Sequence, residues 1–194
     1  MKHRRRIGVD VIVPFVLVAL VFGGLVWQKY REAGQLPDVP PGQQGPALVQ
    51  KVVLFYANDE GKLVREARQV ERCGDRSTCL RSLLDELFSG PISDLTNVYP
   101  EWTTVNDVVF ENGLAVIDLG SDFAEGLAAG SSAEMLAVYG IVNTVCTNLP
   151  EITQVQITID GNRQARLRHL DLSDPLKPYR DLEASQDPSG QERN

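Results

Sequence analysis

A cysteine and a histidine form the sharpest candidate for catalysis in this 194-residue sequence: Cys146 and His169. An imidazole that takes the proton of a nearby thiol turns the sulfur into a nucleophile. The other histidine, His3, lies in a basic N-terminal segment. Cys146 falls on the apolar stripe of a predicted helix, where a cysteine packs as a small hydrophobic side chain and is inert. We therefore expect Cys146 to pack and His169 to lie at the rim of the fold, which leaves a thiol or acid–base enzyme as a remote alternative.

Three aspartates, Asp118, Asp122 and Asp160, form a second candidate, a calcium site. The segment DLGSD lacks the ligand spacing of an EF-hand loop, and a strand end followed by a turn or helix cap explains the same residues. The sequence also has no HExxH or paired CxxC motif for zinc, no glycine-rich phosphate loop and no GxSxG elbow. We expect a protein that is not an enzyme and that binds no metal or cofactor.

Two further cysteines, Cys73 and Cys79, stand close together in the segment CGDRSTC. In an oxidising compartment, two cysteines this close are candidates for a disulfide. The alternative is a pair of free thiols in a mobile loop. Which of the two applies depends on where the chain resides.

The N-terminus predicts that location. Basic residues precede an uncharged apolar run from Val11 to Trp27, which as a helix would reach about 26 Å. We expect an uncleaved transmembrane anchor, and a cleaved signal peptide is the alternative. Because basic residues stay on the cytoplasmic side, the N-terminus is expected in the cytoplasm. The protein would then cross the cell membrane once, with an extracytoplasmic domain that is periplasmic in a Gram-negative cell.

Composition divides the chain further, and charge limits its partners. We expect a cytoplasmic basic segment (1–10), the anchor (11–30), a Pro/Gly linker (31–46), a domain (47–183) and a disordered tail (184–194). The formal charge of the whole chain is −7, although its first 32 residues are basic. The outer part is therefore strongly acidic, which disfavours nucleic acid and anionic lipid as partners.

The first half of the domain predicts a hairpin followed by a helix. The runs 52–57 and 63–70 are typical of two strands joined by the turn 58–61. The helix is expected to begin at Ser77 as N-cap and to end before Gly90. Its buried stripe is expected from Leu80, Leu83, Leu84, Leu87 and Phe88.

The segment 103–119 predicts a second hairpin, because Asn112-Gly113 separates two β-branched runs. A two-residue loop sets Asp107 opposite Asp118, so we expect the ladder to fray or bulge there. The same register forms an apolar face from Val108, Phe110, Ala115 and Ile117.

The last third of the domain predicts a helix and two strands. Ser131 and Glu134 form the expected capping box of the helix. The alternating segment 154–160 and the segment 163–170 are the expected strands. The helix stripe is expected from Leu136, Tyr139, Val142, Val145, Cys146 and Leu149. The whole pattern predicts an α+β fold, a small two-layer sandwich with two helices on one face of a mixed or antiparallel sheet, preceded by the transmembrane helix.

Three arginines, Arg163, Arg166 and Arg168, cluster in the last predicted strand with no acid between them. The domain is otherwise acidic, so a basic strip there would suit an acidic partner, including a neighbouring copy of the chain. The alternative is a solvated strand face in local ion pairs with Asp160 or Asp171.

From about Val52 to Tyr179 the chain resembles the GerMN domain family, the sporulation and spore germination module. The most diagnostic pattern is E-x-L-A-V-Y-x-I-V-N-T, found within SAEMLAVYGIVNTV. The insertion with Cys73 and Cys79 is not part of the family pattern. The similarity lies in the order and spacing of six short blocks: VVLFYANDEGKLV, LLDELFSGP, GLAVIDLGSDF, SAEMLAVYGIVNTV, VQITIDG and HLDLSDPL.

This resemblance implies a compact α/β module that is not known as an enzyme and supplies no catalytic residues. Family members are commonly tethered at the membrane, and the name-giving member works in an extracytoplasmic assembly of spore formers. We therefore expect a membrane-anchored, non-catalytic interaction or assembly module of the bacterial cell envelope, with a role related to sporulation or germination. Its expected partners are envelope proteins or other copies of itself. Binding of a cell-wall glycan or lipid headgroup is the alternative. Aromatic side chains in a groove would support it, but Trp102 is the only tryptophan of the domain and lies beside a loop.

Overall fold

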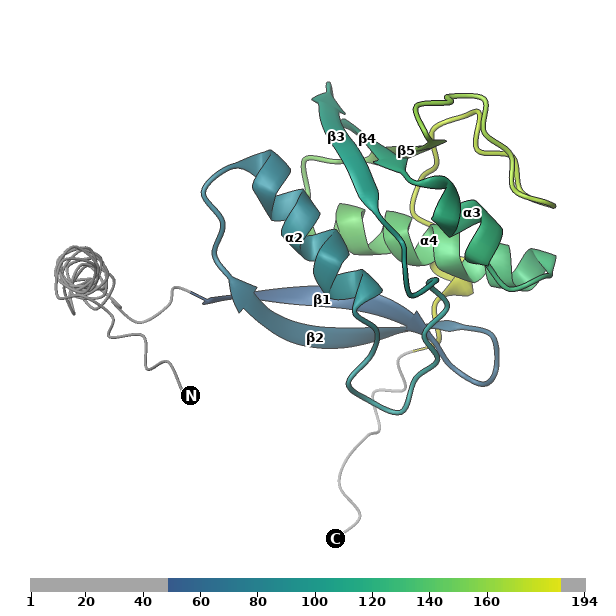
Figure 1. The fold of residues 1–194 in the computed structure, drawn as a ribbon. Coiled ribbons are helices and arrows are strands. Elements are labelled where there is room, and N and C mark those ends of the chain that lie inside the picture. The colour runs from purple at the N-terminus through teal and green to yellow at the C-terminus, as the bar shows by residue number, and fades with distance from the viewer. Residues whose placement is uncertain (1–48, 186–194) are drawn as a thin grey trace, which may run out of the picture. The chain divides into compact units, whose positions relative to one another are not determined.

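The computed structural model describes residues 49–185 (Figure 1). Their elements are β1 (Val49–Ala57), β2 (Leu63–Glu71), α2 (Arg76–Phe88), β3 (Val105–Glu111), β4 (Leu114–Leu119), α3 (Ser121–Gly126), α4 (Ser131–Asn148), β5 (Gln154–Ile159) and the 3-10 helix η1 (Arg180–Leu182). The predicted α+β class is confirmed. The predicted segments 1–10, 11–30 and 31–46 lie outside the described residues, as does the tail from 186 onward. None of the described helices is long and apolar enough to span a membrane.

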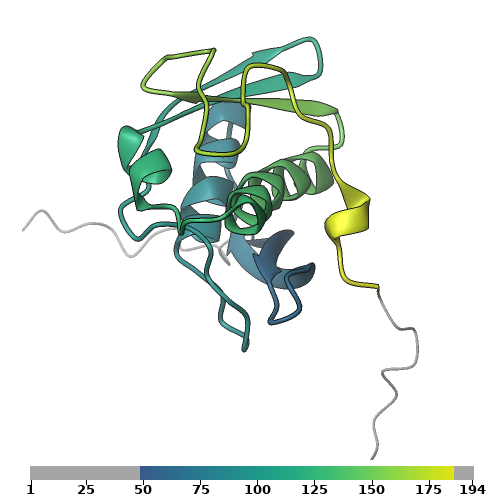
Figure 2. The ribbon, with the colours of Figure 1, turned by 90° about the vertical axis from the view of Figure 1, so that its right-hand side faces the viewer.

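The strands form two separate sheets instead of the single predicted sheet. β1 and β2 pair antiparallel, while β3, β4 and β5 form a mixed sheet in that order, with β4 and β5 parallel. Figure 2 shows α2 and α4 between the two sheets. The predicted two-layer sandwich is therefore wrong, because the helices form a middle layer with a sheet on either side.

The edge of β1 that does not pair with β2 is covered by α4, which explains why the two sheets do not join. The N–H groups of Val53 and Phe55 donate to Asn148 Oδ1 (2.9 Å) and Thr144 Oγ1 (3.1 Å) of α4. Asn148 Nδ2 also donates to the Val53 carbonyl (2.7 Å). Helix side chains thus satisfy the backbone groups that another strand would use.

The start of α2 differs from the prediction, whereas its buried face does not. Asp75, not Ser77, is the N-cap, and its carboxylate accepts hydrogen bonds from the Thr78 N–H (3.0 Å) and hydroxyl (2.6 Å). A carboxylate is the stronger cap because its charge also interacts with the helix dipole. Gly90 follows the helix with a φ of 90°, as a helix end favours. The predicted stripe is confirmed, with Leu80, Leu83, Leu84 and Leu87 buried and Phe88 partly buried.

The hairpin of β3 and β4 forms in the predicted register. Asn112 and Gly113 both take positive φ (44° and 84°), as a two-residue type I′ turn requires. The expected irregularity is also confirmed, because the register shifts immediately before Asp107. Asp107 faces Asp118 in the ladder but bonds instead to Arg81 (3.0 Å), which relieves the contact between like charges.

α4 is buried on nearly every side because it runs between the two sheets. The residues buried outside the predicted stripe are Glu134, Ala137, Val138, Gly140, Ile141, Asn143 and Thr144. The predicted capping box is wrong: Gly130 is the N-cap, Ser131 is exposed, and no side chain caps the helix. The Glu134 side chain instead accepts hydrogen bonds from the backbone of His169 and Leu170.

The segment 163–170, predicted as the last strand, is a compact turn. Two backbone hydrogen bonds fold it back, from the Leu167 N–H to the Leu170 carbonyl (2.9 Å) and from the Leu172 N–H to the Ala165 carbonyl (3.1 Å). The turn buries Ala165, Leu167 and Leu172 against the core. The alternation of apolar and polar residues that predicted a strand therefore comes from a turn that buries alternate side chains.

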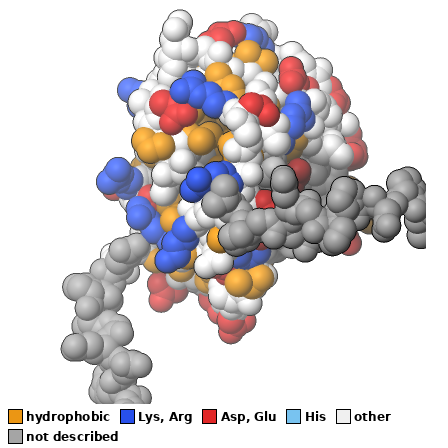
Figure 3. All heavy atoms as spheres, turned by 90° about the vertical axis from the view of Figure 1, so that its left-hand side faces the viewer, with side chains coloured by type: hydrophobic (Ala, Val, Ile, Leu, Met, Phe, Trp, Pro, Cys, Tyr) orange, Lys and Arg blue, Asp and Glu red, His pale blue; other side chains and the backbone are white. Residues whose placement is uncertain are grey.

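Charge is mixed on the end of the molecule where α2 begins and β2 ends. Figure 3 views the left-hand side of Figure 1, and basic side chains lie there among apolar and acidic ones. Arg76, at the start of α2, pairs with Glu151 (3.5 Å). The net negative charge of the chain is thus not spread as an unbroken acidic surface.

Candidate interaction site

The candidate cysteine–histidine pair is not assembled. Cys146, near the end of α4, is half-buried, and burial raises the pKa of its thiol to about 11. His169 lies instead beside Glu134 in the first turn of α4 (Nδ1 to Oε1, 3.0 Å). Three further helical turns, about 18 Å, separate Glu134 from Cys146. The imidazole is therefore not placed to activate the thiol.

The carboxylate of Glu134 is buried and holds the turn that follows β5. Its Oε2 accepts hydrogen bonds from the N–H groups of His169 (2.8 Å) and Leu170 (3.0 Å). Burial raises the pKa of Glu134, but the hydrogen bonds from His169 and Leu170 outweigh this effect and lower the pKa. The sequence pattern hid this role, because Ser-x-x-Glu before an apolar run also fits a capping box.

The three candidate aspartates do not form a metal site. Asp118 accepts hydrogen bonds from Thr158 Oγ1 (2.5 Å), from Asn106 Nδ2 (3.1 Å) and from a backbone N–H (2.7 Å). Asp160 shares the amide of Asn106 (3.3 Å), while Asp122 lies in the first turn of α3. Between residues 49 and 185, no group of three or more His, Cys, Asp or Glu side chains is placed to hold a metal ion.

The three predicted arginines lie in different surroundings and do not form the strip of an extended strand. Arg163 lines a small pocket of about 200 Å³ on the sheet of β3, β4 and β5. Arg166 pairs with Asp171 (3.8 Å), one of the two local partners considered as the alternative. Arg168 donates to the Leu127 carbonyl (3.4 Å). The reason is the turn at 163–170, which replaces the predicted strand.

Cys73 and Cys79 are joined by a disulfide in the structure, with their Cα atoms 5.2 Å apart. The bond ties the loop after β2 to the first turn of α2. It closes around Asp75, the N-cap of that helix. Cys146 is the free cysteine of the described chain.

An irregular connection of 16 residues, 89–104, leads from α2 to β3. Connections longer than about 12–15 residues are uncommon in compact domains and are often functional. The buried carboxylate of Glu66 on β2 holds its first part, because it accepts hydrogen bonds from the Ile92 N–H (3.2 Å), the Ser93 N–H (2.9 Å) and the Ser93 hydroxyl. Burial raises the pKa of Glu66, but the bonds from Ser93, Ile92 and Arg68 outweigh it and lower the pKa to about 2.

Arg68 links the same connection to α2. Its buried guanidinium bonds to Glu66 (2.8 Å), Glu86 (2.5 Å) and the Gly90 carbonyl (2.7 Å). The hydroxyl of Tyr56 also donates to the Gly90 carbonyl (3.0 Å). A buried network in which each member is satisfied fixes a single arrangement of the groups that it joins.

Tyr99 holds the second part of the connection. Its ring is buried, its hydroxyl donates to the Phe55 carbonyl (3.1 Å) at the edge of β1, and its N–H donates to Asn97 Oδ1 (3.0 Å). Gly140 of α4 leaves space for the hydroxyl, because a Cβ at this position would overlap with it. The connection is therefore anchored at both ends by buried groups.

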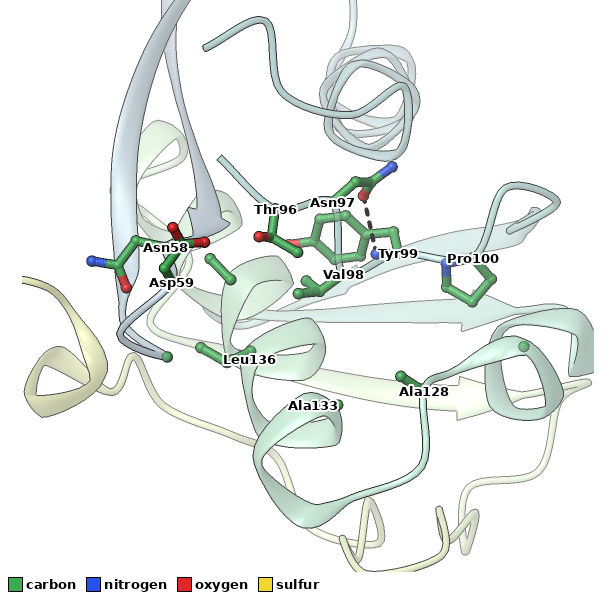
Figure 4. A pocket seen from close by; sticks show the side chains of 13 residues that line it. Asn58, Asp59, Thr96, Asn97, Val98, Tyr99, Pro100, Ala128, Ala133 and Leu136 are labelled. Carbon is green, nitrogen blue, oxygen red and sulfur yellow. Dashed lines mark hydrogen bonds between the residues drawn. The ribbon is translucent and has the colours of Figure 1, made fainter. Parts of the chain in front are cut away.

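A pocket of about 480 Å³ opens beside this connection. Figure 4 shows its walls, which come from the turn between β1 and β2, from residues 96–100, and from the start of α4 with the loop before it. The lining residues are Ala57, Asn58, Asp59, Gly61, Thr96, Asn97, Val98, Tyr99, Pro100, Gly126, Ala128, Ala133 and Leu136. Apolar walls with a few polar groups suit a side chain or small ligand.

Two large apolar side chains of the same connection are exposed, Ile92 (76 %) and Trp102 (74 %). The Thr103 N–H donates to the Pro100 carbonyl (3.1 Å), which closes a turn around Trp102 next to the pocket. A Cβ on Gly126 would come within 2.8 Å of the Pro100 ring, so the glycine allows this turn to pack closely. The connection thus presents a tryptophan from a fixed backbone.

Comparison with known proteins identifies the family. The family model Germane, described as sporulation and spore germination, matches residues 53–165. The chain belongs to this family. No curated protein matches the chain.

A solved structure shows the same fold. The chain is similar to the tandem GerMN domains of the sporulation protein GerM from Bacillus subtilis, with a TM-score of 0.57 and 14% identity over 75% of this chain and 51% of that chain. The chain thus spans about half the length of the tandem structure. The first GerMN domain of the same protein matches with a TM-score of 0.48 and 22% identity, over 66% of this chain and 97% of that chain. At these identities the likeness concerns the fold alone.

The Germane match contains the candidate site. The connection 89–104, the lining of the larger pocket and Glu134 all lie within the matched residues, while Arg166, Arg168 and His169 lie beyond them. The resemblance to GerMN domains that the sequence predicted is confirmed.

Proposed function

We propose that this Germane-family domain is a non-catalytic interaction module, which binds a partner protein through the connection 89–104 and the pocket beside it. The observation that carries the proposal is the exposure of Trp102 on a backbone that buried groups hold in place. Tryptophan is frequent among the residues that dominate binding energy. A surface that is already ordered also loses little conformational entropy on binding.

The composition of the pocket favours binding over catalysis. Its lining has no histidine, cysteine, lysine or arginine, and Asp59 is its one carboxylate. General acid–base catalysis needs a group of suitable pKa within hydrogen-bond reach of the substrate, and a nucleophile needs a neighbouring base. An apolar side chain of a partner, seated in the pocket next to Trp102, fits this lining better than a reacting group does.

The proposed partner is a protein of the bacterial cell envelope, in a process related to sporulation or germination. The family description and the predicted anchor at 11–30 support this part of the proposal. N-terminal sequencing of the mature protein tests the anchor, because an uncleaved chain begins near Met1. A mature start between residues 24 and 34 would show a cleaved signal peptide instead.

Binding of a cell-wall glycan is the second candidate function. Amide and hydroxyl groups of Asn58, Thr96 and Asn97 line the pocket. Trp102, two residues after the lining residue Pro100, is exposed. Such groups would bond sugar hydroxyls, while an aromatic ring would cover the apolar face of a sugar. A glycan would bind the same surface as the proposed partner protein, but through sugar hydroxyls instead of an apolar side chain.

Site-specific photocrosslinking distinguishes the two. A benzophenone amino acid at position 102 of the full chain, expressed in cells, should give a defined protein adduct. The matched control is the same substitution at Val109, which is exposed on β3 of the other sheet (41 %). Trp102→Ala, combined with a crosslinker at position 92, should reduce the yield of the adduct. An adduct that muramidase digestion releases would favour the glycan, and equal labelling from positions 102 and 109 would contradict both candidates.

A further inference from the structure

One edge of β2 is unpaired along most of its length. β1 pairs with the other edge from Leu63 to Glu71. On the free edge, the Ala184 N–H donates to the Leu63 carbonyl (2.8 Å), and no backbone group from Arg65 to Glu71 bonds to any other residue of the described chain on that side. In Figure 1, β2 is the lower strand of the hairpin, and the unlabelled connection that follows α2 passes in front of it.

This open edge contrasts with the edge of β1, which side chains of α4 cover. Natural strand edges are usually protected by proline, by a bulge, by lysine or by inward charges. Residues 65–71 contain no proline and no lysine, and their pairing with β1 shows no bulge. The inward charges of Glu66 and Arg68 bond to each other (2.7 Å), so they do not oppose an approaching strand. The edge is therefore competent to pair.

We propose that residues 65–71 of β2 pair antiparallel with the same residues of a second copy of this chain, around a two-fold axis at Arg68. The free stretch is bounded on one side by Leu63, where Ala184 occupies the edge, and on the other by the end of the strand. Arg68 is its centre. Pairing about that centre sets Arg65 opposite Glu71 of the second copy, so all outward backbone groups of the stretch gain partners.

Charge selects this arrangement over the parallel one. The antiparallel register places the positive Arg65 opposite the negative Glu71 on both sides of the axis. Arg65 also bonds to Glu183 of its own chain (2.8 Å), so Glu71 of the second copy would join an existing ion pair. Parallel pairing in register would place like charges side by side. Arg68 lies at the axis, but its side chain is 9 % exposed and paired with Glu66 and Glu86.

The resulting interface joins two hairpins into one four-stranded sheet, in which the same patch of each copy meets itself. It uses neither Trp102 nor the larger pocket. The inference therefore stands or fails independently of the proposed binding site.

Cysteine crosslinking of the full chain tests the register. Ala67 and Gln69 of two copies would face each other with Cα atoms about 5.5 Å apart, a distance that a disulfide spans. A mixture of Ala67→Cys chains and Gln69→Cys chains should give a disulfide-linked dimer on oxidation. The control is Val109→Cys, also exposed but on another strand, which should stay monomeric. Failure of the 67–69 pair to crosslink, or crosslinking of position 67 to a different protein in its place, overturns the proposal.

A proline substitution tests the backbone pairing. Ala67→Pro removes an outward N–H that has no partner in one copy, and proline is tolerated at such edge positions. Ala67→Val keeps the backbone N–H and adds a side chain similar in size to that of proline. The dissociation constant of the full-chain dimer, measured by sedimentation, should rise about tenfold or more for Ala67→Pro, because each dimer loses two hydrogen bonds, and should change less than about twofold for Ala67→Val. Equal constants for the proline and valine chains overturn the pairing.

Discussion

The hydroxyl of Tyr99 lies against the backbone of Gly140, between α4 and the edge of β1. Only a residue without a side chain leaves room for it. The close approach lets the hydroxyl donate to the Phe55 carbonyl (3.1 Å), a backbone group that would otherwise be buried without a partner. One contact thus joins the connection 89–104, the central helix and the hairpin at the wall of the pocket.

Replacing Gly140 by alanine should therefore destabilise the domain by about 2 kcal/mol or more, although alanine is the better helix former by about 1 kcal/mol. Tyr99→Phe should cost about 1–2 kcal/mol, because the Phe55 carbonyl loses its donor. In the double variant the added methyl no longer overlaps with the hydroxyl, although the Phe55 carbonyl oxygen (3.2 Å) and the ring of residue 99 (3.3 Å) remain close, so the total cost should be smaller than the sum. Urea denaturation of the four proteins gives the coupling energy. Strictly additive costs would show that the two residues do not compete for the same space.

The stability of the domain should depend on the charge of Glu66. Its pKa is lowered from 4.5 to about 2, so its contribution, up to about 3 kcal/mol, is fully present above pH 5 and is lost as the pH falls toward 2. Glu66→Gln should be less stable at pH 7 and should show a flatter decline of the unfolding free energy between pH 5 and 3. The matched control is Glu60→Gln in the exposed turn after β1. If both variants keep the wild-type dependence of the unfolding free energy on pH, Glu66 is not the group that causes the loss of stability in acid.

Features that depend on neighbours in sequence were predictable. The leucine stripe of α2 follows from helical periodicity, and the turn at Asn112 and Gly113 follows from their tolerance of positive φ. Even the shifted register before Asp107 could be expected, because two carboxylates faced each other in the predicted ladder. The helix stripe, the turn and the register shift each depend on residues of one segment or of two adjoining segments.

Features that depend on distant partners were not predictable. Nothing in the sequence distinguishes Glu66 among 26 acidic residues, because Ile92 and Ser93, which it holds, lie 26 and 27 residues further along. Tyr99 and Gly140 belong to different segments, and their contact exists only in the folded chain. The predicted single sheet failed for the same reason, since only the packed structure shows that Thr144 and Asn148 occupy the edge of β1.

Thiol counting tests the bond between Cys73 and Cys79. Protein isolated without reductant and then denatured should show one reactive thiol, that of Cys146, and reduction should reveal all three. Because the bond closes a short loop, the double variant Cys73→Ser with Cys79→Ser should lose about 2 kcal/mol of stability or less. Three reactive thiols before reduction would mean that the two cysteines remain free in the cell.

The exposed arginines after β5 give a test of charge-dependent association. Arg166→Glu with Arg168→Glu should leave the free energy of unfolding within about 1 kcal/mol of wild type, because an exposed ion pair such as Arg166 with Asp171 contributes little. If an acidic partner docks there, crosslinked species in membranes should decrease, most clearly at low salt. Crosslinking that is unchanged in the folded double variant would remove this segment from any interface.

The last test concerns Glu134. A capping box with Ser131 and hydrogen bonds to the turn 163–170 predict different effects of substitution on stability. If Ser131 and Glu134 formed a capping box, Ser131→Ala would cost about 1 kcal/mol. In the structure Ser131 is exposed and caps nothing, so this change should cost less than about 0.5 kcal/mol. Glu134→Gln should cost about 2–3 kcal/mol, because a neutral amide loses the charge-assisted hydrogen bonds that the carboxylate accepts from two backbone N–H groups beside the imidazole. His169→Ala leaves both N–H groups in place and should cost less than Glu134→Gln. Denaturant titrations of the three variants decide between the roles, and a larger loss for Ser131→Ala than for Glu134→Gln would restore the capping box.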